Sequence, residues 1–261
     1  MADASHQFPG PGTLDRALNL VRFLRKECSW DAEQTAESLI PHLLEETHEV
    51  VDAIRAGDLL ALEGELGDLL LNLAFQIVVA EEKSSLDADT VYARLESKMI
   101  ARHPHLFGGG ERRGWEESKA AQRSADESVL SGLASGLDPL TGCYRIQERV
   151  AAVGFDWKDP SGPARKVSEE LGEVLDAIAS GEMDAVVEEV GDLLFAVVNL
   201  ARLAGAHPTT ALARANDKFR ARFCRLEEVA AERGIDPRSA GLDVLDGIWD
   251  ELKREEGPRR Q

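Results

Sequence analysis

The chain has 261 residues, of which 43% are hydrophobic and only 5% aromatic, and it carries a formal net charge of −18 at pH 7. That length and apolar content suffice for one large globular domain or two modest ones. A charge of this sign repels the phosphate backbone of nucleic acid, so we expect no DNA or RNA partner. It also repels free nucleotides, so any phosphate chemistry here requires metal ions between carboxylates and phosphates.

The ends of the chain and its cysteines indicate the compartment. Residues 1–12 lack both a basic start and an apolar run, so we expect a flexible tail and not a signal peptide. The longest apolar stretch, 69–80, is shorter than the roughly 20 residues of a membrane-spanning helix. The three cysteines are far apart and form no CxxC pair, which argues against disulfides or a zinc knuckle. We therefore expect a cytoplasmic protein with no membrane partner.

The predicted elements are helices throughout. Apolar residues recur at helical spacing in the segment 14–24 and then in 39–54, and no segment alternates as a strand does. A glycine follows the second of these segments, at Gly57, where it suits a left-handed C-terminal cap. Two antiparallel helices are expected to flank the short loop there, and the pattern returns around Gly181. The predicted fold class is therefore all-α.

The chain repeats itself at an offset of 124 residues. Residues 44–54, LEETHEVVDAI, return as SEELGEVLDAI at 168–178, and GELGDLL at 64–70 returns as EEVGDLL at 188–194. The loop between the motifs has equal length in both copies, which chance does not readily produce. Between the copies, small turn-forming residues indicate a linker. We therefore predict a first helical domain (13–123), a linker (124–140), a second helical domain (141–256) and a C-terminal tail (257–261).

Each copy carries two pairs of acids three residues apart. Because residues at that spacing share a helical face, Glu46 with Glu49 and Glu65 with Asp68 project their carboxylates together, and a hairpin brings the pairs close. Clustered carboxylates repel one another unless divalent ions with hard oxygen ligands remove that cost. Oxygen-only ligands favour Mg²⁺, with Mn²⁺ as a substitute, over zinc. The second copy repeats the quartet as Glu170, Glu173, Glu189 and Asp192.

The alternative is that these acids form solvated helix faces, as most Glu pairs in a charged helical protein do. Here each pair stands among apolar residues, as in ELGDLLL at 65–71, and a glycine separates the acids. Glycine costs a helix about 0.5–1 kcal/mol relative to alanine, so Gly67 and Gly191 predict close approach by another helix or a ligand. The repetition of this arrangement favours the metal site.

Cations and tryptophans accompany the acids in both copies. A lysine and an arginine four residues apart can neutralise phosphate oxygens from one helical face. A tryptophan four residues before a lysine offers a surface on which a base can stack. Solubility and packing are the alternative roles. These residues are Lys98, Arg102, Trp115 and Lys119 in the first copy, and Lys218, Arg222, Trp249 and Lys253 in the second.

The acidic pattern Glu-Glu-x-x-Glu followed by Glu-x-x-Asp, at 45–68 and again at 169–192, resembles that of the MazG family of all-α nucleoside triphosphate pyrophosphohydrolases. The segments RHPHLF at 102–107 and VGFDW at 153–157 also look like segments of that family. The resemblance implies two tandem helical-bundle domains and a homodimer that builds its sites between helices. It further implies Mg²⁺-dependent hydrolysis of a (d)NTP to the monophosphate and pyrophosphate.

The resemblance also implies residue roles. The second quartet would be catalytic and hold Mg²⁺, and the first quartet would hold metal in its own half. The nucleotide would contact Lys166, Lys218, Arg222, Trp249 and Lys253, with the first-copy cations and Trp115 as analogues. His42 stands where the second copy has Lys166, and Asn72 becomes Ala196, so the copies need not be equally active. A nucleotide-sensing or partner-binding helical protein that has lost turnover is the alternative reading.

Overall fold

The computed structural model describes residues 14–83, 86–108, 111, 114 and 127–257. Its regular elements are all helices in these residues, which confirms the all-α fold class. The chain divides into two compact units, Met1–Ser118 (unit 1) and Lys119–Gln261 (unit 2). None of the described helices combines the length and apolar content that crossing a lipid bilayer demands.

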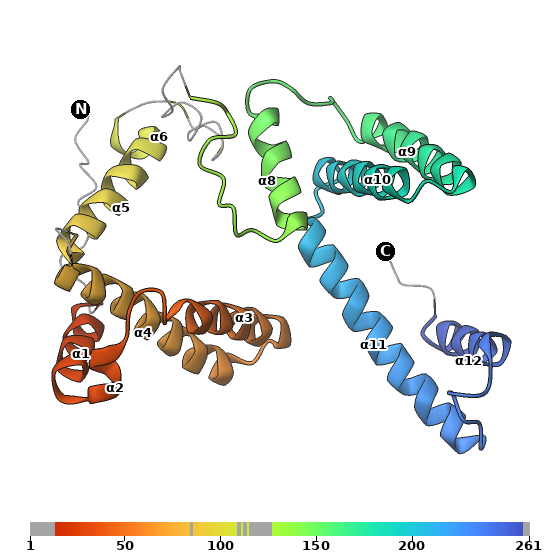
Figure 1. The fold of residues 1–261 in the computed structure, drawn as a ribbon, viewed down its shortest axis with the longest axis horizontal. Coiled ribbons are helices and arrows are strands. Elements are labelled where there is room, and N and C mark those ends of the chain that lie inside the picture. Colours follow the sequence, from red (N-terminus) through yellow and green to blue (C-terminus); the bar gives the residue numbers. More distant parts are fainter. Residues whose placement is uncertain (1–13, 84–85, 109–110, 112–113, 115–126, 258–261) are drawn as a thin grey trace. The chain divides into compact units, whose positions relative to one another are not determined.

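Unit 1 is built on an antiparallel helical hairpin (Figure 1). Its two helices meet at Gly57, whose φ of 68° gives the predicted left-handed cap. The first helix of the unit packs against the second arm of the hairpin, and buried Leu18, Val21, Phe75 and Val78 form the core between them. The helices are α1 (Leu14–Glu27), α2 (Ser29–Glu33), α3 (Ile40–Ala56), α4 (Leu59–Lys83), α5 (Ala88–Arg102) and α6 (Pro104–Phe107).

Unit 2 repeats the hairpin and adds a long helical arm (Figure 1). The hairpin turns at Gly181, where φ is 78°, again as predicted. The helix before the hairpin packs on its second arm, and the last two helices pair through Leu226, Ala230, Ile248 and Leu252. The helices are α8 (Pro139–Ala151), α9 (Ser161–Ser180), α10 (Met183–Leu203), α11 (Pro208–Glu232) and α12 (Leu242–Glu255).

Local chemistry fixes the start of α8 and the loop between α8 and α9. Asp138 caps α8 by accepting a hydrogen bond from the Thr141 amide at 3.0 Å. Gly162, in the first turn of α9, lies directly under the indole of Trp157: a Cβ there would come within 2.2 Å of the ring. Glycine is therefore required at this position, and the loop that precedes α9 is held over the start of that helix.

The predicted linker, 124–140, is described from residue 127 onward: 127–138 contains no helix, and α8 begins at Pro139, two residues before the predicted start of the second domain. The two units divide between Ser118 and Lys119, a few residues ahead of the predicted linker. The predicted N-terminal tail, 1–12, lies outside the described residues, as does the C-terminal tail beyond residue 257.

Candidate metal and nucleotide site

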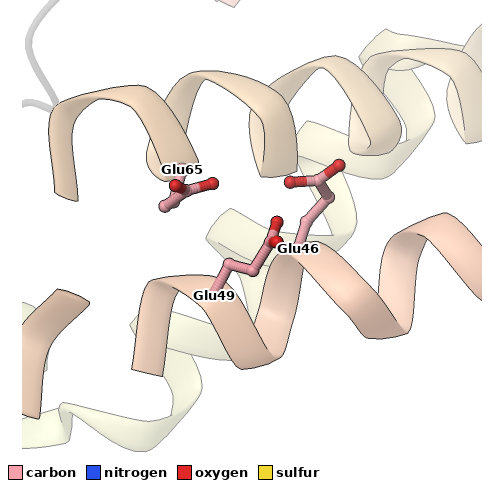
Figure 2. A group of neighbouring side chains, drawn as sticks. All are labelled: Glu46, Glu49 and Glu65. Carbon is pink, nitrogen blue, oxygen red and sulfur yellow. The ribbon is translucent and has the colours of Figure 1, made fainter. Parts of the chain in front are cut away.

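An acidic cluster lies between the two arms of the unit 1 hairpin. Glu46 and Glu49 extend from α3 toward Glu65 on α4 (Figure 2), and one oxygen from each carboxylate lies within 4.8 Å of those of the other two. Partial desolvation, reinforced by the charges of Asp68, Glu49 and Glu65, raises the pKa of Glu46. The pKa of Glu65 is raised in the same way. The hairpin thus holds like charges together at an electrostatic cost.

Unit 2 places Glu170, Glu173 and Glu189 in the same arrangement, again within 4.8 Å. The surroundings differ, because Lys166 forms ion pairs with Glu170 and, at 2.8 Å, with Glu169. This ammonium group lowers the pKa of Glu170, whereas the hydrogen bond to Glu170 and the nearby negative charge raise the pKa of Glu173. At the position of Lys166, unit 1 has the half-exposed His42, whose nearest acid is Glu45 at 3.8 Å.

The donor set of unit 2 fits a hard divalent cation. Every candidate ligand is a carboxylate oxygen, the donor type that Mg²⁺ and Mn²⁺ prefer. Glu170 is only 3% exposed, and its Oε2 atom has no hydrogen-bond partner within the described chain. A buried carboxylate oxygen without a partner is unfavourable unless a ligand satisfies it. Glu170 is therefore the feature that most strongly favours a metal position among the described residues.

A cavity of about 670 Å³ opens beside this acidic cluster. Lys166, Glu170 and Asp192 line the cavity and connect it to the cluster. The remaining lining is mostly apolar and aromatic, supplied by α8, by the loop before α9, by the first turn of α9 and by α10. The apolar lining residues are Ile146, Val150, Phe155, Trp157, Pro163, Phe195 and Ala196.

A polar network forms another part of the cavity lining. Arg202 donates two hydrogen bonds to Asp156, at 3.0 and 2.5 Å, and a third to Asn199 Oδ1 at 2.7 Å. Gln147 is 2% exposed and donates from Nε2 to the Phe195 carbonyl at 2.8 Å. The sequence motifs indicate no role for Gln147, Asn199 or Arg202. Polar residues at helix positions that the first copy fills with apolar residues are the signal that identifies them.

The remaining predicted nucleotide contacts of unit 2 lie on α11 and α12, which contact each other but not α9. Arg222 sits 4.8 Å from the centre of the Trp249 ring and binds Glu256 through two hydrogen bonds. Lys253 pairs with Asp250 at 3.3 Å, and Lys218 is exposed. Among the predicted cations that the structure describes in unit 2, only Lys166 forms an ion pair with a clustered carboxylate.

In unit 1, Lys98 and Arg102 lie on α5, which contacts α4 and α6 but not α3 among the described helices. Trp115 and Lys119 lie outside the described residues. The glycines between the acids also differ from expectation: no atom beyond the local helix lies within 4 Å of a Cβ built at Gly67 or Gly191. The close approach that these glycines predict is therefore not made by any of the described helices.

The comparison with known proteins decides the family. The model of the MazG nucleotide pyrophosphohydrolase domain matches residues 34–107 and again 160–224. The chain belongs to the MazG family. Over 257 residues it is 38% identical to the nucleoside triphosphate pyrophosphohydrolase of Escherichia coli strain K12, covering 93% of this chain and 98% of that protein. Over 230 residues it is 39% identical to the nucleoside triphosphate pyrophosphohydrolase/pyrophosphatase MazG of Thermotoga maritima, covering 87% and 89%. The two segments of the present chain that match the family, 34–107 and 160–224, contain its two acidic clusters.

Proposed function

We propose that this chain is a Mg²⁺-dependent nucleoside triphosphate pyrophosphohydrolase, which converts a (d)NTP and water to the (d)NMP and pyrophosphate, and that unit 2 performs the chemistry. One observation carries the proposal: in unit 2 a carboxylate cluster, a lysine and a sizeable cavity lie next to one another. The names of the E. coli and T. maritima relatives support the same activity. Removal of unwanted nucleotides from the cytoplasmic pool is the role we assign to it.

In this proposal Glu170, Glu173, Glu189 and Asp192 would hold the metal, and the bound ion would supply positive charge against the triphosphate and acidify water. Lys166 holds Glu170 in its ionised form and offers its ammonium group to a phosphate oxygen. A carboxylate that the metal does not fully occupy accepts a proton from the attacking water. The apolar walls of the cavity exclude bulk water and so strengthen these charge interactions.

Product analysis tests the proposal directly. The purified protein is incubated with each (d)NTP in Mg²⁺ or in EDTA, and the products are separated by ion-exchange chromatography. Monophosphate and pyrophosphate that appear only with Mg²⁺ are the expected result. Diphosphate with orthophosphate would indicate a different phosphatase chemistry. Nucleotide binding without turnover would favour the alternative, a nucleotide-sensing protein that has lost turnover.

We further propose that the protein works as a homodimer. The hairpin of unit 2 exposes an apolar stripe that the described part of its own unit does not cover, with neighbours three or four residues apart along each helix. The hairpin of unit 1 exposes apolar residues at the equivalent positions, including Ile54, Leu66 and Leu70. A second copy would bury the stripe and bring the cations of its own α11 and α12 to the carboxylates. The unit 2 stripe consists of Leu171, Leu175, Ile178, Met183, Val187, Val190 and Leu194.

Two defective chains test this arrangement. Glu173→Ala lacks a metal-binding carboxylate, and Arg222→Ala lacks a cation of the arm. When the two chains are co-expressed with different tags, a mixed dimer contains one site in which both features are intact. Recovery of activity in the purified mixed dimer, when each parent dimer is inactive, is the expected result. A mixed dimer as inactive as its parents would show that the cations act within their own chain.

A further inference from the structure

An ion pair binds the loop between α8 and α9, residues 152–160, to the second arm of the unit 2 hairpin. Arg202, in the last turn of α10, donates to both carboxylate oxygens of Asp156, at 3.0 and 2.5 Å. The two side chains are 11% and 21% exposed, so the pair is largely shielded from water. A bidentate bond of this kind fixes direction as well as distance. The loop therefore cannot leave α10 without losing both hydrogen bonds.

The guanidinium group of Arg202 is directed at the protein itself. Nη2 donates both of its hydrogens, one to Asp156 and one to Asn199 Oδ1 at 2.7 Å. Nη1 donates to Asp156, and Nε is buried. The carboxylate of Asp156 also balances the positive charge at short range, which leaves little attraction for a phosphate. These bonds favour a role in holding the loop over a role in contacting the triphosphate.

The loop that Arg202 holds carries part of the cavity wall. Asp156 and Trp157 both line the cavity. The Trp157 amide donates to Asp156 Oδ1 at 2.9 Å, so the ion-paired carboxylate also orients the backbone that follows it. The Trp157 indole then lies over Gly162, one helical turn before Lys166. The ion pair thus connects α10 to the first turn of α9, next to the lysine that reaches the acidic cluster.

Unit 1 holds the corresponding segment, between α1 and α3, with a different arginine. Val78 stands 124 residues before Arg202 and belongs to the packed core, so α4 offers no cation at this position. Arg25 on α1 instead donates to the backbone carbonyls of Asp31 and Gln34, at 2.7 and 3.1 Å. Arg25 therefore anchors a segment beside a packed core, whereas the ion pair of unit 2 anchors a loop beside a cavity.

We propose that Arg202 is a positioning residue: through Asp156 it holds the loop 152–160 against α10, in the conformation that accepts the substrate. The inference rests on the proposed function, because the substrate is the nucleoside triphosphate of that proposal. Without the ion pair the loop would populate open conformations, and only the remaining closed fraction would bind. Binding weakens in proportion to that fraction, whereas the complex, once formed, turns over as before.

Steady-state kinetics of two variants test the consequence for binding. Arg202→Gln and Asp156→Asn each remove one charge of the ion pair, and Asp156→Asn does so with almost no change of shape. Each should raise KM about 10-fold and leave kcat within about twofold, as expected if about a tenth of the molecules keep the loop closed. A loss of folded protein has the opposite signature, since it lowers the apparent kcat at unchanged KM. That signature in both variants would overturn the proposal.

The double variant distinguishes one ion pair from two independent contacts. If Arg202 acts through Asp156, Arg202→Gln combined with Asp156→Asn should raise KM by about the same 10-fold as either change alone. A rise near 100-fold, the product of the two single effects, would overturn the proposal.

Arg25→Gln is the matched control, because it removes the arginine that anchors the equivalent segment of unit 1. It should lower the midpoint of thermal unfolding and leave KM unchanged. A 10-fold rise of KM in Arg25→Gln would overturn the proposal, since the effect would then follow from loosening either unit.

Hydrogen exchange of the free protein tests the ion pair without nucleotide. In Arg202→Gln and in Asp156→Asn, the backbone amides of 153–160 should exchange about 10-fold faster than in the unaltered protein, because the loop opens more often. Exchange of residues 28–36 should change only in Arg25→Gln. Unchanged exchange of 153–160 in both unit 2 variants would overturn the proposal. If the unaltered protein hydrolyses no nucleotide, the proposed function fails, and the exchange rates still decide whether Arg202 holds the loop.

Discussion

Units 1 and 2 share a helical hairpin and an acidic cluster but differ in what surrounds them. In unit 2 the cluster adjoins Lys166 and a cavity of about 670 Å³, whereas in unit 1 the corresponding positions hold His42 and a packed apolar core. The acids alone therefore do not distinguish the halves. The halves differ at three positions next to the hairpin, where unit 2 has the polar Gln147, Asn199 and Arg202 lining its cavity and unit 1 has the buried apolar Val21, Phe75 and Val78.

The pKa values of equivalent carboxyl groups also distinguish the two clusters. Lys166 lowers the pKa of Glu170, whereas the equivalent Glu46 lies among other acids and its pKa is raised. An ionised carboxylate is a metal ligand, and a protonated one is a poor ligand. Glu170 thus stays ionised to a lower pH than Glu46 does, as the metal site proposed for unit 2 requires. This difference and the cavity both favour unit 2 as the catalytic half.

The largest expected effect separates the two acidic clusters. Glu173→Ala should lower kcat/KM about a thousandfold, because a preorganised charge at the reacting centre is lost. Its counterpart Glu49→Ala, at the equivalent position of unit 1, should change kcat/KM less than about twofold, which is within the effect of an ordinary surface change. Initial rates of pyrophosphate release measure both. A comparable loss in Glu49→Ala would mean that unit 1 also carries out the reaction.

The next effect concerns stability. Phe75 is 4% exposed in the core of unit 1, so Phe75→Ala should lower the free energy of unfolding of that unit by about 3–5 kcal/mol. Turnover at temperatures below unfolding should remain near that of the unaltered enzyme. Asn199→Ala, the matched change in unit 2, should cost less stability and more activity, since Asn199 accepts from Arg202 at the cavity. Denaturant unfolding of the full chain and steady-state rates separate the two. A Phe75→Ala enzyme that is folded but inactive would contradict the assignment of the reaction to unit 2.

Much of the fold could be predicted from the sequence, because its determinants are local. Helical periodicity and the glycines at 57 and 181 predict both hairpins, and the structure confirms them. The acids three residues apart lie on the facing sides of those hairpins, so the clustering of Glu46 with Glu65, and of Glu170 with Glu189, also follows from spacing. Their roles as metal ligands stay a prediction.

The cavity could not be predicted in this way, because it depends on contacts between distant segments. Gln147 meets the Phe195 carbonyl 48 residues away, and Arg202 meets Asp156 46 residues away. No local period links these positions. The cations on α11 and α12 show a related limit, since four-residue spacing places them on one helical face but does not say which carboxylates, or which copy of the chain, that face meets.

Exchanging the residues at positions 166 and 42 tests whether the charge of Lys166 distinguishes the two units. Lys166→His should lower kcat/KM about 10- to 100-fold at pH 8, where imidazole is neutral and no longer offers a charge to Glu170 or to phosphate. Lys166→Arg, which keeps the positive charge, should retain more activity. The reciprocal His42→Lys should add no activity to a chain whose unit 2 carries Glu173→Ala, because packed apolar residues occupy the equivalent positions of unit 1. Turnover restored by His42→Lys would show that charge alone separates the two units.

The smallest expected effect comes from the repulsion among the carboxylates of the unit 1 cluster, which lowers the stability of that unit. Desolvation and neighbouring acids raise the folded-state pKa of Glu46, so folding favours its protonated form. The penalty is absent below the unfolded-state pKa, grows as the pH rises through the interval up to the folded-state pKa, and is complete above it. In EDTA at pH 7, Glu46→Gln should therefore raise the midpoint of thermal unfolding slightly, and this gain should fade on acidification.

With Mg²⁺ the sign should reverse, because glutamine removes a ligand whose binding stabilises the folded unit. Scanning calorimetry of both proteins, in EDTA and in Mg²⁺, measures these shifts; Glu96→Gln on α5, outside the cluster, should show neither. A Glu46→Gln midpoint that responds identically to EDTA and to Mg²⁺ would mean that unit 1 keeps its acids without binding metal, and the likeness between the two halves would then extend to their sequence and not to their chemistry.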